Sequence, residues 1–318
     1  MVASIPFFEM RMVTDGVLAQ WGSTSVVIPT FGIPVDPWAT LVCLGILIGM
    51  EWGRYRCIKM GLSVRDLIDG VIVTILLGFF FAHVITVVAY YPERLTEDGI
   101  WAILRVWEGF SSTGGFVGAF IGMPLWFLVL RHRFYPLWDS LWRRLGFEVP
   151  NETYEALTLS EFGRFADLIA FGFPLGWLFG RLGCAVVHDH VGMPTSFALG
   201  MAFPEGHWAA GIRHELGFYE FLAMIPMVAL FAWLGRKDQP NGTFMGLFFL
   251  VYAPLRFVLD FYRNVDLAVS DARYFGLTPA QYGMVALGLF GLVLFLRRDR
   301  DAPAWPLDGQ PDQAARAT

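Results

Sequence analysis

The stretch 180–195 reads G-R-L-G-C-A-V-V-H-D-H-V-G-M-P-T, and it passes from an apolar run into a polar loop. Arg181 therefore lies near the end of a predicted membrane helix, where a charge is expensive and is expected to have a functional or structural partner. Cys184, His188 and Asp189 follow closely. Titratable groups thus gather where hydrocarbon meets water, and the remaining chain can be interpreted as a scaffold that brings other charges to this point.

The composition indicates an integral membrane protein. Of the 318 residues, 56% are hydrophobic and only 16% are charged, whereas about a quarter of the residues in a soluble domain are charged. The net charge of −5 is uninformative, because the placement of Lys and Arg, not their balance with acids, sets orientation. We expect no nucleic-acid partner. The three cysteines are too few and too scattered for a disulfide framework.

The chain divides into three parts. Residues 1–36 are interrupted by prolines and are expected to form an amphipathic or irregular segment at the membrane interface. Residues 37–300 form the predicted transmembrane domain. Residues 301–318 are charged and contain prolines, which predicts a disordered cytoplasmic tail.

Apolar runs long enough to approach the roughly 20 residues that a bilayer requires recur along the transmembrane part. They predict an all-α polytopic membrane protein, a bundle of about seven transmembrane helices. The seven runs are Trp38–Trp52, Leu67–Tyr91, Gly114–Leu130, Phe165–Val187, Gly217–Leu234, Gly242–Phe261 and Ala280–Leu296.

Basic residues follow the odd-numbered runs and predict the topology. They include Arg54 after the first run, Arg131 after the third, Arg236 after the fifth and Arg297 after the seventh. Because Lys and Arg accumulate in cytoplasmic loops, the N-terminus is expected outside and the C-terminus inside. Residues 188–215 then form a periplasmic loop or small head between the fourth and fifth helices. We see no internal repeat, which disfavours an inverted-repeat transporter.

Glycines recur at a spacing of four residues, as at Gly45 and Gly49 or Gly172 and Gly176. Such small-residue faces usually allow close helix packing. Gly114 and Gly115 differ, because they follow a polar run over residues 107–113. A polar run at the start of a helix can present backbone N–H groups to an anion.

Two further arginines lie near the sixth run. Arg256 and Arg263 are seven residues apart, about two helical turns, and would share one helix face with Tyr252 and Asp260. One interpretation is an internal Arg256–Asp260 ion pair that braces the bundle. The other is that the guanidinium groups bind a phosphate, which suits their planar, permanently charged fork.

Four of the six histidines fall between residues 188 and 214. A metal site is conceivable with Cys184 and Asp189 nearby, but the spacing matches no tight zinc pattern, and we expect no metal. A histidine beside Arg and Asp could instead act as a base near neutral pH. At the start of the fifth run, Tyr219 suits an interfacial aromatic belt, whereas Glu220 does not.

The order of these motifs resembles the prolipoprotein diacylglyceryl transferase family, from about Trp38 to Arg298. The sequence blocks that carry the resemblance are Trp38-Ala39, W-E-G-F-S-S-T-G-G (107–115), G-R-L-G-C-A-V-V-H-D-H-V-G (180–192), R-H-E-L-G-F-Y-E (213–220), Y-A-P-L-R-F-V-L-D-F-Y-R (252–263) and L-T-P-A-Q (277–281).

This chain also departs from the family pattern. Ala39 stands where the family has Tyr, Thr113 replaces its His, and Cys184 replaces its Asn. The fifth-run motif has Glu215 and Gly217 in place of Pro and Gln. The residues matching a phosphate-binding site are thus kept, while the expected proton-handling residue is changed, and His188, His190 or His214 could act in its place.

The resemblance implies an enzyme without metal or cofactor in the bacterial inner membrane. It would transfer the diacylglyceryl group of phosphatidylglycerol to the lipobox cysteine thiol of a prolipoprotein, with release of glycerol phosphate and with membrane lipids around it. The alternatives are a transferase with another acceptor and a catalytically silent member that binds lipid or lipoprotein. The expected catalytic residues are Arg181, Arg256, Asp189, His188 and His190. The expected substrate-binding residues are Arg181, Arg256, Arg263, Tyr252, Gly114, Gly115, Gly192, Tyr219 and Glu220.

Overall fold

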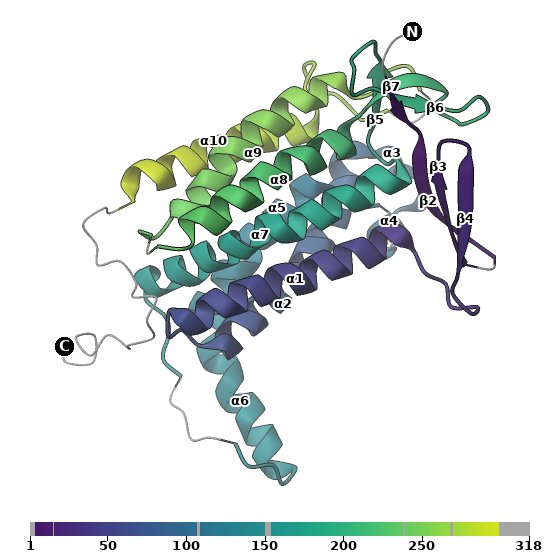
Figure 1. Cartoon of the computed structure of the whole chain (residues 1–318). Coiled ribbons are helices and arrows are strands. Elements are labelled where there is room, and N and C mark those ends of the chain that lie inside the picture. The colour runs from purple at the N-terminus through teal and green to yellow at the C-terminus, as the bar shows by residue number, and fades with distance from the viewer. Residues whose placement is uncertain are drawn as a thin grey trace. The chain divides into compact units, whose positions relative to one another are not determined.

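A computed structural model describes residues 4–14, 16–106, 109–149, 154–237, 239–267 and 270–298 (Figure 1). The predicted disordered tail, and Trp107 and Glu108 of the polar run, lie outside the described residues. The chain forms two compact units. Unit 1 contains Met1–Gly53, Phe171–Lys237 and Phe248–Leu289, and unit 2 contains Arg54–Ala170, Asp238–Leu247 and Phe290–Thr318.

The predicted runs all become helical. Run one lies in α1 (Pro37–Lys59), run two in α2 (Val64–Ile85) and η1 (Thr86–Tyr90), and run three in α5 (Ser112–Pro124) and η2 (Leu125–Leu130), followed by α6 (Arg131–Arg144). The remaining runs become α7 (Leu159–Val187), α8 (Leu216–Leu234), α9 (Thr243–Leu259) with η3 (Asp260–Tyr262), and α10 (Pro279–Arg297). Two short helices, α3 (Glu93–Asp98) and α4 (Trp101–Leu104), join α2 to α5.

The protein is a multi-pass, mostly helical membrane protein. Among the described residues, six helices are long and apolar enough to cross a bilayer, one fewer than the expected seven. The helix outside this set is α1, which has 23 residues but carries Glu51, Arg54 and Arg56. The charges in its second half lower the mean hydropathy of α1. Its length is sufficient to cross a bilayer, since 23 residues span about 34 Å.

The first 36 residues were expected to form an amphipathic or irregular segment, and the irregular alternative was wrong because strands form there. β2 (Phe8–Val13), β3 (Gly16–Trp21) and β4 (Thr24–Pro29) form a three-stranded antiparallel sheet in which Phe8 faces Trp21 and Trp21 faces Thr24. Gly22 turns the chain between β3 and β4 with φ 57°, a value that glycine adopts easily. The β-branched residues of β4 favour an extended strand.

A second sheet forms the head expected between the fourth and fifth long helices. Its strands are β1 (Ile5–Pro6), β5 (Val191–Pro194), β6 (Met201–Phe203) and β7 (Gly211–Glu215), in the order β1-β6-β7-β5. β1 pairs parallel with β6, and the other pairs are antiparallel. The N-terminus therefore completes a sheet built nearly 200 residues later in the chain, over a core of Phe7, Val191, Met201, Phe203 and Ala209.

Glycines allow close helix contacts in both units, as predicted. In unit 1, a Cβ on Gly172 of α7 would lie 2.4 Å from the carbonyl oxygen of Gly49 in α1. In unit 2, a Cβ on Gly114 of α5 would lie 2.2 Å from the carbonyl oxygen of Phe81 in α2. No side chain fits at such separations, so these helices pack backbone against backbone.

Candidate functional site

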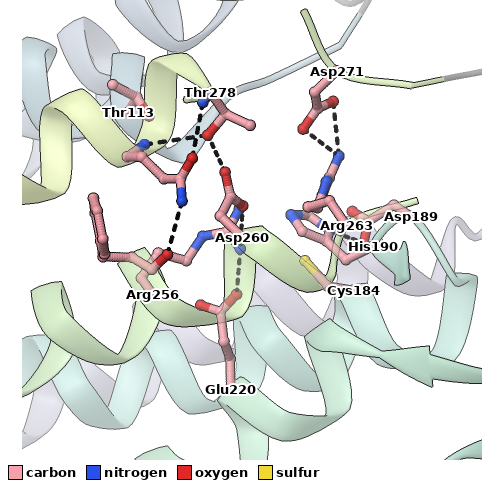
Figure 2. Close-up of polar contacts among 12 residues, drawn as sticks. Thr113, Cys184, Asp189, His190, Glu220, Arg256, Asp260, Arg263, Asp271 and Thr278 are labelled. Carbon is pink, nitrogen blue, oxygen red and sulfur yellow. Dashed lines mark hydrogen bonds and ion pairs between the residues drawn. The ribbon is translucent and has the colours of Figure 1, made fainter. Parts of the chain in front are cut away.

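A buried cluster of charges lies in unit 1 and draws on three helices. Figure 2 shows its members Glu220, Arg256 and Asp260. α7 contributes Arg181, α8 contributes Glu220, and α9 with η3 contributes Tyr252, Arg256 and Asp260. Each of these side chains is 4% exposed or less. Burying so many ionic groups is unfavourable unless they pair with one another or bind a ligand.

Glu220 is the carboxylate shared by the cluster. Its Oε2 lies 3.1 Å from Arg181 Nε, and its Oε1 lies 3.4 Å from Arg256 Nη1. The Tyr252 hydroxyl donates to Oε2 at 2.6 Å. Two guanidinium groups from separate helices therefore meet at one carboxylate, and Figure 2 shows Glu220 directed at Arg256.

The second carboxylate is Asp260, whose Oδ1 lies 2.9 Å from Arg256 Nη1. This is the internal ion pair that the sequence suggested as one interpretation. Asp260 also accepts from the Thr278 hydroxyl. Sequence reasoning did not assign Thr278 or Gln281 to the site, although T-P-A-Q has the spacing of a capping box.

That capping box is present at the start of α10. The Thr278 N–H donates to Gln281 Oε1 at 3.0 Å, and the Gln281 N–H donates to Thr278 Oγ1 at 3.2 Å. Gln281 Nε2 also donates to the Phe257 carbonyl at 3.1 Å. One polar unit therefore fixes the start of α10, the end of α9 and the Asp260 carboxylate together.

The cluster contains two guanidinium groups and two carboxylates, yet its hydrogen bonds are incomplete. Among the described residues, Arg256 Nε and Nη1, Glu220 Oε1 and Asp260 Oδ1 are buried with no hydrogen-bond partner. Arg256 Nη1 has ion-pair neighbours but no aligned acceptor. Buried donors of this kind are expensive to leave unsatisfied, so Arg256 has capacity for a further anionic acceptor.

Arg181, by contrast, is surrounded by acceptors. Besides Glu220, Nη2 donates to the Tyr252 hydroxyl at 3.3 Å, and Nη1 lies 3.8 Å from Cys184 Sγ and 3.4 Å from His190 Nε2. A guanidinium group only donates, so Nε2 of His190 is the unprotonated nitrogen. Nδ1 of His190 then carries the proton and donates to Asp189 Oδ1.

Asp189 is placed to orient this ring. Its side chain is 39% exposed. Partial desolvation raises the pKa of Asp189, but the nearby His190 and Arg181 lower it further, so the net pKa lies below the usual value. The group is therefore a carboxylate at neutral pH. A carboxylate on Nδ1 fixes the histidine tautomer and leaves the lone pair on Nε2.

His188 was expected among the catalytic residues, but it belongs to the head. Its Nε2 contacts the Phe8 carbonyl at 2.6 Å and its Nδ1 contacts Glu215 Oε2 at 3.3 Å. The ring is 2% exposed and stacks on Phe7 with a centroid separation of 5.1 Å. Both ring nitrogens are thus occupied, one by Phe8 of β2 and the other by Glu215 of β7 in the head.

Arg263 does not share a helical face with Arg256, so that expectation was wrong. α9 ends at Leu259, η3 follows, and Arg263 is an extended residue with ψ 144°. Its Nη2 pairs with Asp271 at 2.8 Å. Its backbone forms a β-bridge with Gly192, where a Cβ would lie 2.5 Å from the Tyr262 carbonyl oxygen.

The remaining expected binding residues have local partners. The Tyr219 hydroxyl lies 3.0 Å from His214 Nδ1 and donates to the Leu199 carbonyl at 3.2 Å. Gly114 and Gly115 belong to unit 2, where the Ser111 side chain caps the Gly114 N–H at 3.2 Å. That N–H, expected to serve an anion, is therefore already paired.

Comparison with known proteins points to one family. The family model described as prolipoprotein diacylglyceryl transferase matches residues 25–144 and 154–297. A phosphatidylglycerol–prolipoprotein diacylglyceryl transferase of Chromohalobacter salexigens is 28% identical over 87% of this chain and 92% of its own length. Proteins of the same name from Teredinibacter turnerae and Nitratidesulfovibrio vulgaris (strain DP4) are 26% and 30% identical over 88% and 81% of this chain, and 89% and 88% of their own lengths.

Proposed function

The chain belongs to the prolipoprotein diacylglyceryl transferase family, and we propose that it transfers the diacylglyceryl group of phosphatidylglycerol to the lipobox cysteine of a prolipoprotein. The cysteine sulfur attacks the glyceryl carbon that carries the phosphate. A C–S bond forms, the C–O bond to phosphate breaks, and glycerol phosphate leaves with the bonding electrons. The proton of the thiol passes to a base on the enzyme.

The observation that carries this proposal is the meeting of Arg181 and Arg256 at Glu220. Negative charge develops on the phosphate oxygen as the C–O bond breaks. Fixed positive charge in a water-poor site stabilises that change strongly. Glu220 holds the two guanidinium groups in place before the lipid arrives, so little reorganisation is required.

The two arginines have different roles in this mechanism. Arg256 has buried N–H groups with no hydrogen-bond partner in the described chain and is the main phosphate ligand. Arg181 contacts Glu220, Tyr252 and His190, and it orients the groups around the reacting atoms.

His190 is the base that receives the thiol proton. Its Nδ1 faces Asp189, and its lone pair on Nε2 lies beside Arg181. The attacking species must be a thiolate, and a neutral histidine can accept the proton near pH 7. His188 and His214 are supporting residues, because each contacts groups of the head.

We assign the protein to the bacterial inner membrane, with the N-terminus periplasmic and the C-terminus cytoplasmic. Residues 37–300 form the transferase domain, residues 1–36 its interfacial segment and residues 301–318 its tail. Phosphatidylglycerol reaches the charge cluster from the surrounding lipid. The signal peptide of the prolipoprotein brings the acceptor cysteine to the same leaflet.

The test compares three arginine-to-lysine variants in thioether formation with purified protein, phosphatidylglycerol and a lipobox peptide. We expect R256K to lose at least about a hundredfold in kcat/KM, because lysine cannot supply the paired N–H groups at a developing charge. R181K should also lose activity. R213K is the matched control, because Arg213 is buried and pairs with Asp266 at 2.6 Å in the head.

Full activity of R256K in folded protein would overturn the proposal.

The two alternative functions would give different products in the same assay. A transferase with another acceptor would consume phosphatidylglycerol analogues without labelling lipobox peptide. A silent member would bind lipid and release no glycerol phosphate. Both alternatives are included in the test because the chain departs from the family pattern at Ala39, Thr113 and Cys184.

A further inference from the structure

Two turns in unit 1 share an unusual conformation. Thr30-Phe31-Gly32-Ile33 has φ 53° at Phe31 and 79° at Gly32, and the Ile33 N–H donates to the Thr30 carbonyl at 3.0 Å. Residues 274–277 repeat the pattern, with φ 51° at Phe275 and 84° at Gly276, and the Leu277 N–H donates to the Tyr274 carbonyl at 3.1 Å. Positive φ at both central residues is the signature of a type I′ turn.

Phenylalanine is a poor residue for the first central position. A bulky side chain disfavours the left-handed region, and Asn, Asp or Gly usually stands there. The folded chain provides no compensating contact, because Phe31 is 92% exposed and Phe275 is 102% exposed. Together with His188, these are the positive-φ residues other than glycine in the described chain. A strained φ value that no contact within the chain compensates, and that occurs in two turns, suggests that each Phe ring has a partner outside the chain.

Each turn directly precedes a long apolar helix. α1 begins at Pro37, six residues after Phe31, and α10 begins at Pro279, four residues after Phe275. Six extended residues reach at most about 22 Å, so the connecting chain is short enough for each ring to lie at the level at which its helix enters the bilayer. α10 is one of the six helices able to span it.

Chemistry also favours lipid over a protein partner of defined charge. Residues 30–35 (T-F-G-I-P-V) and 274–278 (Y-F-G-L-T) contain no charged side chain. Exposed apolar residues accompany both turns, namely Val26, Ile28 and Ile33 in the first case and Tyr274 in the second. Rings presented on short rigid turns suit the interfacial zone, where aromatic residues are enriched.

We propose that Phe31 and Phe275 are a pair of membrane anchors, each held on a type I′ turn and inserted into the lipid interface where α1 and α10 begin. The second anchor is tied to the charge cluster, because Arg273 donates to the Gly276 carbonyl at 3.4 Å and to the Asp260 carbonyl at 3.2 Å. Its depth in the membrane would therefore fix the level of Asp260. The anchors do not depend on the transferase activity proposed above.

The first experiment places the photoreactive residue p-benzoylphenylalanine at position 31, 275 or 205 of the full chain. The protein is reconstituted in vesicles of phosphatidylethanolamine and phosphatidylglycerol, irradiated and analysed for adducts by mass spectrometry. Glu205 is the control, an exposed acidic residue in the loop between β6 and β7. We expect phospholipid adducts at 31 and 275 in at least fivefold excess over 205. Yields at the control level, or adducts to a second copy of the chain, would overturn the proposal.

The second experiment separates anchoring from a role in turn formation. F31N and F275N remove the ring but suit the left-handed conformation, so the melting temperature in detergent should be unchanged or higher. A probe at Ile33 in F31N, or at Leu277 in F275N, should give several-fold fewer lipid adducts than the same probe beside the native Phe. Equal yields would show that the rings do not hold the turns in the membrane. Both measurements remain valid if the enzyme proves inactive.

Discussion

Glu220 is the residue whose charge the site can least tolerate losing. It lies between Arg181 and Arg256 and accepts from Tyr252, with no exposed surface. Removing one partner of a buried ion pair leaves an uncompensated charge, which costs about 3–5 kcal/mol. We predict that E220Q lowers the melting temperature in detergent and abolishes thioether formation.

The control for this prediction is E205Q, because Glu205 is exposed. That variant should match the wild type in both measurements, since surface changes are usually within about 0.5 kcal/mol. A stable and active E220Q would show that the arginines do not need the shared carboxylate.

Three histidines can be separated by the same substitution at each. H190Q should lower kcat by about 10²–10⁴-fold, the usual contribution of a general base. H188Q should lower stability instead, because it breaks contacts to Glu215 and Phe8. H214Q should change either quantity little. An unchanged kcat in H190Q would show that His190 is not the general base.

At this scale the sequence predicted which charges are intramembrane, but not all of their contacts. Arg181, Glu220 and Arg256 stand out because charges in apolar runs are rare. Arg263 was misplaced because the face argument assumes one continuous helix, and a 3-10 turn over Asp260–Tyr262 ends it. Which histidine faces Arg181 depends on the turn after α7, where His188 has φ 55°, and periodicity carries no information on such a turn.

At the scale of elements, the α1–α7 contact offers a sharp test. A Cβ at Gly172 would lie 2.4 Å from the Gly49 carbonyl oxygen, whereas a Cβ at Gly180 in the same helix would meet nothing within 4 Å. We predict that G172A destabilises the protein by about 1–3 kcal/mol through overpacking. G180A should stabilise it by roughly 0.5–1 kcal/mol, because Ala is the better helix former. Equal effects of G172A and G180A on the melting temperature would argue against backbone contact between α1 and α7.

The helices were predictable and the strands were not, for a physical reason. An apolar run of about 20 residues reports local partition into lipid. Strand pairing such as Ile5 with Met201 joins residues far apart in the chain, and a two-residue strand carries no periodic signal of its own. Pro6 and Pro29 end the strands β1 and β4, whereas the sequence argument took the prolines of the first 36 residues only as breaks in any long period.

The head sheet should make stability pH-dependent. Burial and the neighbouring His188 lower the pKa of His207, and burial lowers that of His214. Below the ordinary value of 6.5 the unfolded chain then binds more protons than the folded one, so the free energy of unfolding falls as pH drops towards the folded pKa. Burial raises the pKa of Glu215, an effect of opposite sign.

The measurement is the melting temperature in detergent between about pH 8 and pH 5.5, a range that brackets the histidine pKa. Wild type should lose stability towards the acid end, and H207Q should lose less. Because Glu215 is unchanged in the variant, the difference between the two curves isolates His207. Parallel curves would show that His207 is equally protonated in the folded and unfolded chains.

At the scale of the whole molecule, the topology depends on α1. Six crossings would place both termini on one side, whereas a seventh places them on opposite sides. α1 is about 34 Å long, enough for a hydrocarbon core of roughly 30 Å. Its charges Arg54 and Lys59 lie in the last two turns, where long side chains can reach the headgroups, and Arg56 is buried against the Phe244 ring. We therefore predict that α1 crosses and that the N-terminal sheet is periplasmic.

Two cysteine substitutions test this directly, in a C43S background because Cys43 is the exposed native cysteine. Thr24 of β4 and Lys59 at the end of α1 are both exposed and flank the helix. A membrane-impermeant maleimide should label T24C in intact spheroplasts, and K59C only after the membrane is permeabilised, since Lys and Arg mark the cytoplasmic side. Labelling of both before permeabilisation would mean that α1 lies on the surface. That result would also contradict the pairing of β1 with β6, because the head that follows α7 would then lie across the membrane from the N-terminal segment.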